Sequence, residues 1–190
     1  MSDGKRPSTS EIAERMTEYA HIDGLSPTEY ENAMHAVAEL TPIFTHDRSC
    51  FVLGSYGTYE IRRLQLVKDR LNRETNTYAF LMVDMQGEWY NTIVKFRLLA
   101  DYVTHIVGVA EHDESGFLVE QGMFVIQPAY FAKTYGLKRE YNREVLEGKF
   151  GGTEPFSQLQ LDIFAMLNRE GRFSVWETED DLSQCAENLL

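Results

Sequence analysis

Cysteine is scarce in this chain. Only Cys50 and Cys185 occur, far apart and without the spacing of metal ligands. This argues against the disulfide framework of a small secreted domain and against a zinc site. The five histidines also show no metal-ligand spacing. We therefore expect reduced thiols, no bound metal and no cofactor.

Long hydrophobic runs are absent as well. No segment approaches the length of about 18 apolar residues that a membrane-spanning helix needs. The first ten residues are polar and lack the apolar core of a signal peptide. We therefore expect a cytoplasmic protein without a membrane partner.

Basic residues are few relative to acidic ones. The chain has 30 Asp and Glu against 18 Lys and Arg, which gives a formal net charge of −12. Such a charge repels phosphate backbones and anionic lipid surfaces, so we expect no binding to duplex nucleic acid. Of the basic residues 12 are Arg and 6 are Lys. This bias, together with the acidity, predicts a halophilic protein whose carboxylates keep its surface hydrated.

Hydrophobic residues make up 43% of the 190 positions, which is enough for one continuous core. Residues 1–46 carry two helix starts and predict an N-terminal helical hairpin. Ser8 stands three residues before Glu11, and Ser26 is followed by Pro27 and then Glu29.

The second helix of this hairpin has an apolar stripe of Tyr30, Met34 and Val37, and the dipeptide Thr41-Pro42 closes it. Two short helices bury little by themselves. The stripe is therefore expected to dock on the main domain or on a second copy of the chain, which would make a homo-oligomer.

Residues 47–190 alternate short apolar runs with amphipathic stretches, which is typical of parallel strands joined by helical crossovers. We predict an α/β domain, a three-layer sandwich with a five-stranded, mostly parallel sheet. The flavodoxin-like or Rossmann-like order 2-1-3-4-5 is expected, because it places the turns after strands 1 and 3 on either side of a switch point. The strands are expected at residues 50–53, 78–83, 104–110, 133–141 and 172–176.

The turn after the first strand, Gly54-Ser55-Tyr56-Gly57, is a candidate ligand-binding segment. Glycines let backbone amides approach a ligand closely. The turn lacks the full phosphate-loop and dinucleotide fingerprints. The alternative interpretation is a tight strand-to-helix turn in which Tyr56 only covers the sheet end.

Glu120 is the candidate catalytic residue. Its neighbours are apolar, so the carboxylate is expected to be partly desolvated at a helix start. Such a group can act as a nucleophile or stabilise an oxocarbenium-like transition state at a sugar carbon. Two alternatives remain open: a capping or ion-paired glutamate, and a strand over residues 117–126.

Three further positions complete the prediction. Gly122 would allow a ligand or a neighbouring strand to come close. Asp84 ends the second strand and is expected either to reach a ribose hydroxyl or to be a solvated turn residue. Asp101 precedes the third strand on the side away from this pocket, so we interpret it as a helix-end or turn residue.

Three short motifs carry a family resemblance: residues 51–57 (Phe-Val-Leu-Gly-Ser-Tyr-Gly), 99–107 (Leu-Ala-Asp-Tyr-Val-Thr-His-Ile-Val) and 116–122 (Gly-Phe-Leu-Val-Glu-Gln-Gly). With them the chain resembles the nucleoside 2-deoxyribosyltransferase-like superfamily and the related TIR-like nucleotide-binding domains. The resemblance spans residues 50 to 126. The chain departs from the pattern by its Tyr-Gly after the first strand and by the bulky Phe124.

This resemblance implies that Glu120 cleaves an N-glycosidic bond and that the Gly54–Gly57 turn helps to hold a nucleotide or nucleoside. Gly116, the first residue of the third motif, is a further candidate ligand-binding residue. The alternative function is a noncatalytic protein-interaction or assembly module on a degenerate version of the same fold. An open cavity at the switch point would favour the enzyme. A crevice filled by Tyr56, Tyr59, Trp89 or Phe124 would favour the module.

Overall fold

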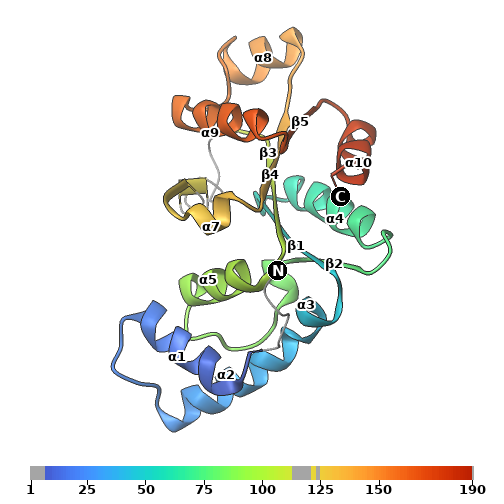
Figure 1. The fold of residues 1–190 in the computed structure, drawn as a ribbon. Helices are drawn as coiled ribbons and strands as arrows, with labels where there is room; N and C mark the ends of the chain where they lie inside the picture. The colour runs from blue at the N-terminus through green and yellow to red at the C-terminus, as the bar shows by residue number, and fades with distance from the viewer. Residues whose placement is uncertain (1–6, 113–120, 123–124, 190) are drawn as a thin grey trace.

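A computed structural model describes residues 7–112, 121–122 and 125–189 (Figure 1). Its sheet has five strands, all parallel, in the order β2-β1-β3-β4-β5. The predicted α/β fold and strand order are confirmed. The strands are β1 (Arg48–Gly54), β2 (Thr77–Leu81), β3 (His105–Ala110), β4 (Thr134–Arg139) and β5 (Phe173–Trp176).

Helices cover both faces of the sheet, which gives three layers (Figure 1). The central strand β1 is apolar on both sides, as expected for a parallel strand between two helical layers. Its Cys50 and Val52 join a core beneath α4 (Glu60–Leu71) and α10 (Glu179–Glu187). Its Phe51 and Leu53 join a core on the opposite face, with α5 (Thr92–Tyr102) and α9 (Gln158–Arg169).

The first three helices are α1 (Thr9–Ala20), α2 (Pro27–Glu39) and α3 (Thr41–Thr45). Both expected capping boxes form, at Ser8 with Glu11 and at Ser26 with Glu29. The chain does not stop being helical at Thr41-Pro42, because proline is tolerated in the first turn and α3 begins there.

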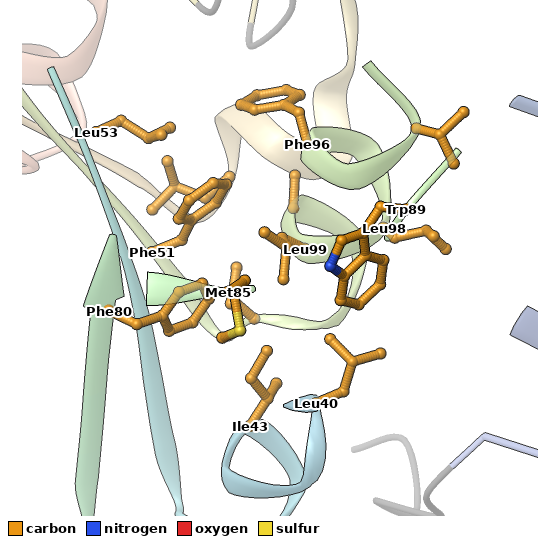
Figure 2. Packing of buried hydrophobic residues seen from close by; sticks show 14 of the residues in the cluster. Leu40, Ile43, Phe51, Leu53, Phe80, Met85, Trp89, Phe96, Leu98 and Leu99 are labelled. Carbon is orange, nitrogen blue, oxygen red and sulfur yellow. The ribbon is translucent and has the colours of Figure 1, made fainter. Parts of the chain in front are cut away.

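The helical hairpin packs on its own α/β domain. Helix α1 contacts α5, and Ile12 and Met16 of α1 are buried in the same core as Phe51 and Phe80 of the sheet. Figure 2 shows residues of this core from β1, β2, α3, α5 and the segment before α5. The hairpin and the sheet therefore share one apolar cluster.

The prediction that an apolar stripe of α2 is buried is wrong for two of its three residues. Val37 is buried, but Tyr30 and Met34 are 40% and 50% exposed. Helix α2 instead turns Ala33 and Ala36 inward, where small side chains allow close packing.

Other differences concern element ends. Strand β2 stops at Leu81, because Met82–Asp84 form a turn of 3-10 helix. The structure adds two short helices that the sequence did not predict, α7 (Pro128–Phe131) and α8 (Arg143–Phe150). A strand over residues 117–126 is wrong for its described part, since residues 121, 122, 125 and 126 are helical.

In the part of the chain that the structure describes, no helix is both long and apolar enough to cross a lipid bilayer.

Candidate functional site

The sheet reverses its direction of growth at β1, whose neighbours are β2 on one side and β3 on the other. Ligands of open parallel sheets bind at such a point, in the crevice outside the carboxyl ends of the strands. Here the last residue of β1, Gly54, pairs with Val109 of β3. The turn after β1 and the segment after β3 therefore leave the same edge of the sheet side by side.

Gly54 is needed for packing. A Cβ atom at this position would lie 2.7 Å from both Leu64 Cδ2 of α4 and the carbonyl oxygen of Val109. The absence of a side chain thus lets α4 and β3 close on the end of β1. This packing agrees with the interpretation of the motif as a tight strand-to-helix turn. The backbone of Ser55 to Gly57 follows at the carboxyl edge of the sheet.

The next residues of the turn reach toward β2. The Tyr56 hydroxyl accepts a hydrogen bond from the Met82 amide at 3.2 Å, so the side chain lies over the carboxyl end of β2. Asp84 accepts hydrogen bonds from the Leu81 amide at 2.9 Å and from Lys68 Nζ at 3.1 Å. These contacts give Asp84 the role of a turn-capping, ion-paired residue.

Glu120 and Gly116 lie outside the described residues. The residue after Glu120, Gln121, is buried and its Oε1 accepts a hydrogen bond from Gln160 Nε2 at 3.0 Å. Gln160 lies in the first turn of α9, so this bond ties Gln121 to that helix. No described atom lies within 4 Å of a Cβ at Gly122, and no described strand packs against it.

A buried ion cluster, which the sequence did not predict, occupies the carboxyl edge beside the switch point. The Glu111 side chain, 5% exposed, directly follows β3. Its carboxylate pairs with Arg63 Nη1 of α4 at 2.9 Å and with Arg139 Nη1 of β4 at 3.0 Å. The Tyr141 hydroxyl donates to the Glu111 carbonyl oxygen at 2.8 Å. We call Arg63, Glu111 and Arg139 the edge triad.

Aromatic rings hold the two guanidinium groups of the edge triad. Arg139 lies 5.1 Å from the Trp176 ring and 4.9 Å from the Tyr141 ring, and Arg63 lies 6.0 Å from Trp176. Trp176 is itself fixed, since its Nε1 donates to the Leu137 carbonyl at 3.2 Å. Burial raises the pKa of the Tyr141 hydroxyl, which keeps it a neutral donor.

A second acidic group approaches the loop after β3. Glu60 Oε1 lies 3.7 Å from His112 Nε2, and its own backbone amide and His112 lower the pKa of the Glu60 carboxyl. Three buried nitrogens in this region have no hydrogen-bond partner among the described residues: Arg63 Nε, Arg139 Nε and His112 Nδ1. Buried polar atoms are normally paired, so these three are candidates for contact with a ligand.

A pocket of about 230 Å³ opens beside the edge triad, at the carboxyl ends of β4 and β5. Its wall is polar and of mixed charge, with a cationic and an anionic set of side chains. It is lined by Lys138, Arg139, Glu140, Tyr141, Leu146, Glu154, Pro155 and Glu177.

The aromatic residues that would fill the crevice in the interaction-module alternative lie in different places. Tyr56 covers the end of β2, and Tyr59 is mostly exposed before α4. Trp89 does not lie in the crevice at all, because it packs with Leu40 and Leu99 in the hairpin-side core (Figure 2). Phe124 lies outside the described residues.

Asp101 lies at the opposite edge of the sheet, as expected, but it is more than a helix-end residue. Its carboxylate accepts hydrogen bonds from Arg15 at 2.8 Å, from Tyr130 at 2.7 Å and from Tyr19. Lys133 Nζ donates to the Asp101 and Val103 carbonyls that end α5, and burial lowers the pKa of Lys133 to about 8. These contacts join α1, α5 and α7, which is a structural role.

The sequence analysis missed the edge triad because its members lie in three separate segments, 48 and 28 positions apart. One local signal was available. Glu111 directly follows the apolar strand β3, at the carboxyl end where ligands of this fold bind. Among the described residues, no group of three or more His, Cys, Asp or Glu side chains is arranged to hold a metal ion.

Comparison with protein families places the chain in a family. The model of a family of unknown function, DUF8170, matches residues 1–150, which include the hairpin, β1 to β4 and every member of the edge triad. No curated protein matches the chain.

Proposed function

The chain belongs to the DUF8170 family, and we propose that it binds a nucleotide or nucleoside at the carboxyl edge of its sheet and cleaves the N-glycosidic bond through Glu120. The observation that carries the proposal is the pairing of Gly54 with Val109 at the switch point. This register brings the Gly54–Gly57 turn, which the resemblance assigns to nucleotide binding, next to Glu111 and His112, the first residues of the segment that leads in the sequence to Glu120.

Contacts outside the strands also connect the segment after β3 with the helix that follows the Gly54–Gly57 turn. Glu111 and His112, the first residues after β3, face Arg63 and Glu60 of α4, the helix that follows the Gly54–Gly57 turn. The chain next to Glu120 is attached as well, through Gln121 and Gln160. Gln121 is thereby fixed to α9, and Glu120 precedes it directly in the sequence.

The proposed chemistry uses Glu120 as the charge-stabilising group. As the bond between the anomeric carbon and the base nitrogen breaks, its electron pair leaves with the base, which takes up a proton. The carboxylate either bonds to the sugar carbon, as an ester that water then hydrolyses, or stabilises the positive carbon until water attacks. In both cases the attacking water releases a proton, which balances the one taken up by the base. A partly desolvated carboxylate does this more effectively than a solvated one, because its field is less screened.

The test is base release from a panel of nucleosides, nucleoside monophosphates and nicotinamide dinucleotide, with the full chain. Glu120→Gln keeps the size and hydrogen bonding of the side chain but removes its charge. We expect turnover to fall by about a hundredfold or more while ligand binding survives. Glu31→Gln on the exposed surface of α2 is the matched control. A Glu120→Gln variant with undiminished turnover would refute the catalytic role.

One observation favours the noncatalytic interaction module as a second candidate function. Tyr30 and Met34 lie four residues apart on α2 and stay exposed, an apolar pair that a second copy of the chain could cover. On this view the protein self-associates and releases no base from any substrate. Light scattering on the wild type and on Met34→Lys tests it: a dimer that the substitution converts to a monomer supports the module, and a monomeric wild type contradicts it.

A further inference from the structure

We propose that the edge triad is a phosphate-binding subsite, so that the ligand is a phosphorylated one, a nucleoside monophosphate. The inference rests on the proposed function, because it specifies the chemical class of the ligand at the same edge of the sheet. Its evidence is the unused hydrogen-bonding capacity of Arg63 and Arg139, the charge of the triad and the neighbouring pocket.

Each guanidinium group of the triad is only partly used. Arg63 and Arg139 both give an Nη1 to the carboxylate of Glu111, while the Nε of each is buried and has no hydrogen-bond partner among the described residues. A buried donor without an acceptor is unfavourable, so the arrangement favours a ligand that supplies acceptors. Phosphate oxygens match the fork of N–H groups that a guanidinium presents.

The charge of the triad points to an anion. Within the triad two guanidinium groups face one buried carboxylate, and the remaining positive charge is paired with a more exposed carboxylate outside it. That carboxylate is Glu179 of α10, whose Oε1 lies 3.8 Å from Arg63 Nε on a side chain that is 51% exposed. At this distance Glu179 forms no hydrogen bond to Arg63, and it would compete with a phosphate for the same guanidinium.

The donors are held in place without a ligand. Trp176 lies beside both guanidinium groups, at 5.1 Å from Arg139 and 6.0 Å from Arg63, and Tyr141 lies on a second side of Arg139. Little side-chain freedom remains to be lost on binding, which favours affinity. The same contacts make Trp176 a reporter, since a ligand on Arg139 changes the environment of the indole.

The pocket beside Arg139 accounts for the rest of the ligand. Its volume is about 230 Å³, and Glu140, Glu154 and Glu177 line it together with Lys138 and Arg139. Carboxylates accept hydrogen bonds from sugar hydroxyls, whereas the arginine end accepts a phosphate. A ligand with both groups, such as a ribose monophosphate unit, fits this division better than a nucleoside alone.

The experiment compares AMP, adenosine and inorganic phosphate by calorimetry on the full chain, and by Trp176 fluorescence in a Trp89→Phe background. We expect AMP to bind at least about tenfold more tightly than adenosine, because a phosphate adds charge-assisted hydrogen bonds. Arg139→Met should abolish this difference, and Glu179→Gln should tighten AMP binding. Arg62→Met, which removes an exposed arginine next to the triad, should change nothing.

Equal binding of AMP and adenosine that Arg139→Met leaves unchanged would overturn the subsite but not nucleoside binding. If neither compound binds and no compound of the panel releases a base, the proposed function fails, and inorganic phosphate decides the subsite separately. Phosphate binding that Arg139→Met weakens would support the subsite, and no phosphate binding would overturn it. Should Arg139→Met fail to fold, Arg139→Lys keeps the charge but not the fork, and AMP binding as tight as in the wild type would contradict the proposal.

Discussion

Arg15 of α1 and Asp101 of α5 form an ion pair at 2.8 Å, although 86 positions separate them in the chain. Tyr19 and Tyr130 donate hydrogen bonds to the same carboxylate. One half-buried aspartate therefore connects the helical hairpin to two helices of the α/β domain. Its removal should weaken the packing of α1 and α7 as well as that of α5.

We expect Asp101→Asn to lower the free energy of unfolding by about 2–4 kcal/mol, because it leaves Arg15 without its anion and weakens three hydrogen bonds at once. Urea denaturation followed by circular dichroism measures the change. Asp69→Asn, on the exposed surface of α4, is the control and should change stability by less than about 0.5 kcal/mol. Equal midpoints for the two variants would show that the Asp101 contacts contribute little.

Lys133 should make stability depend on pH in the alkaline range. Burial lowers the pKa of its ammonium group to about 8 in the folded state, whereas the ordinary value is 10.5. Between these values the unfolded chain binds more protons at Lys133 than the folded chain does, so the Lys133 contribution to stability rises with pH from about 8 to about 10.5. In Lys133→Met this rise is lost.

The measurement is the difference in free energy of unfolding between wild type and Lys133→Met at several pH values. We expect the free energy of unfolding of the wild type to rise relative to that of Lys133→Met from pH 8 to pH 10. Burial also raises the pKa of Tyr19, to about 12, but this group is common to both proteins and cancels in the difference. A difference that stays constant with pH would contradict the buried position of the Lys133 ammonium group.

Gly54→Ala tests the packing at the end of β1. The added methyl group would lie 2.7 Å from Leu64 Cδ2 and from the carbonyl oxygen of Val109, so α4 or β3 must move. We expect a loss of about 1–3 kcal/mol, typical of an overpacked site. Gly24→Ala is the matched control, since no atom of the described residues lies within 4 Å of a Cβ there. Thermal melting of both variants gives the comparison, and a Gly54→Ala protein as stable as the control would refute the packing role.

Salt should stabilise the fold. With 30 acidic residues and a net charge of −12, the folded chain has carboxylates that repel one another, and added ions screen this repulsion. We expect the melting temperature to rise between low and molar potassium chloride. A melting temperature that stays level or falls over this range would argue against the halophilic character.

The features of the fold that were predicted correctly depend on residues close together in the sequence. The capping boxes at Ser8 and Ser26 depend on residues three positions apart, and the parallel direction of the strands follows from the alternation of strands and helices. The inward face of α2 was misjudged, because Tyr30 and Met34 fit a helical stripe as well as Ala33 and Ala36 do. Only the packing against neighbouring helices decides between the two faces.

The charged contacts escaped prediction for a related reason. Arg63, Glu111 and Arg139 each look like ordinary solvated residues of their own segments, and their meeting depends on β3 lying between β1 and β4. Asp101 is similar, since its partners come from α1 and α7. Long-range ion pairs depend on the three-dimensional arrangement of the strands and helices. The sequence determines this arrangement, but no local pattern in the sequence reveals the pairs.

The separation of Arg15 from Asp101 also sets an order of events during synthesis. At a typical rate of about 5–20 residues per second, the 86 positions between them take on the order of 4 to 17 seconds to translate. Throughout that interval Ile12 and Met16 have no α5 to cover them. During synthesis the hairpin therefore exposes an apolar face that a chaperone specific for apolar helices would recognise.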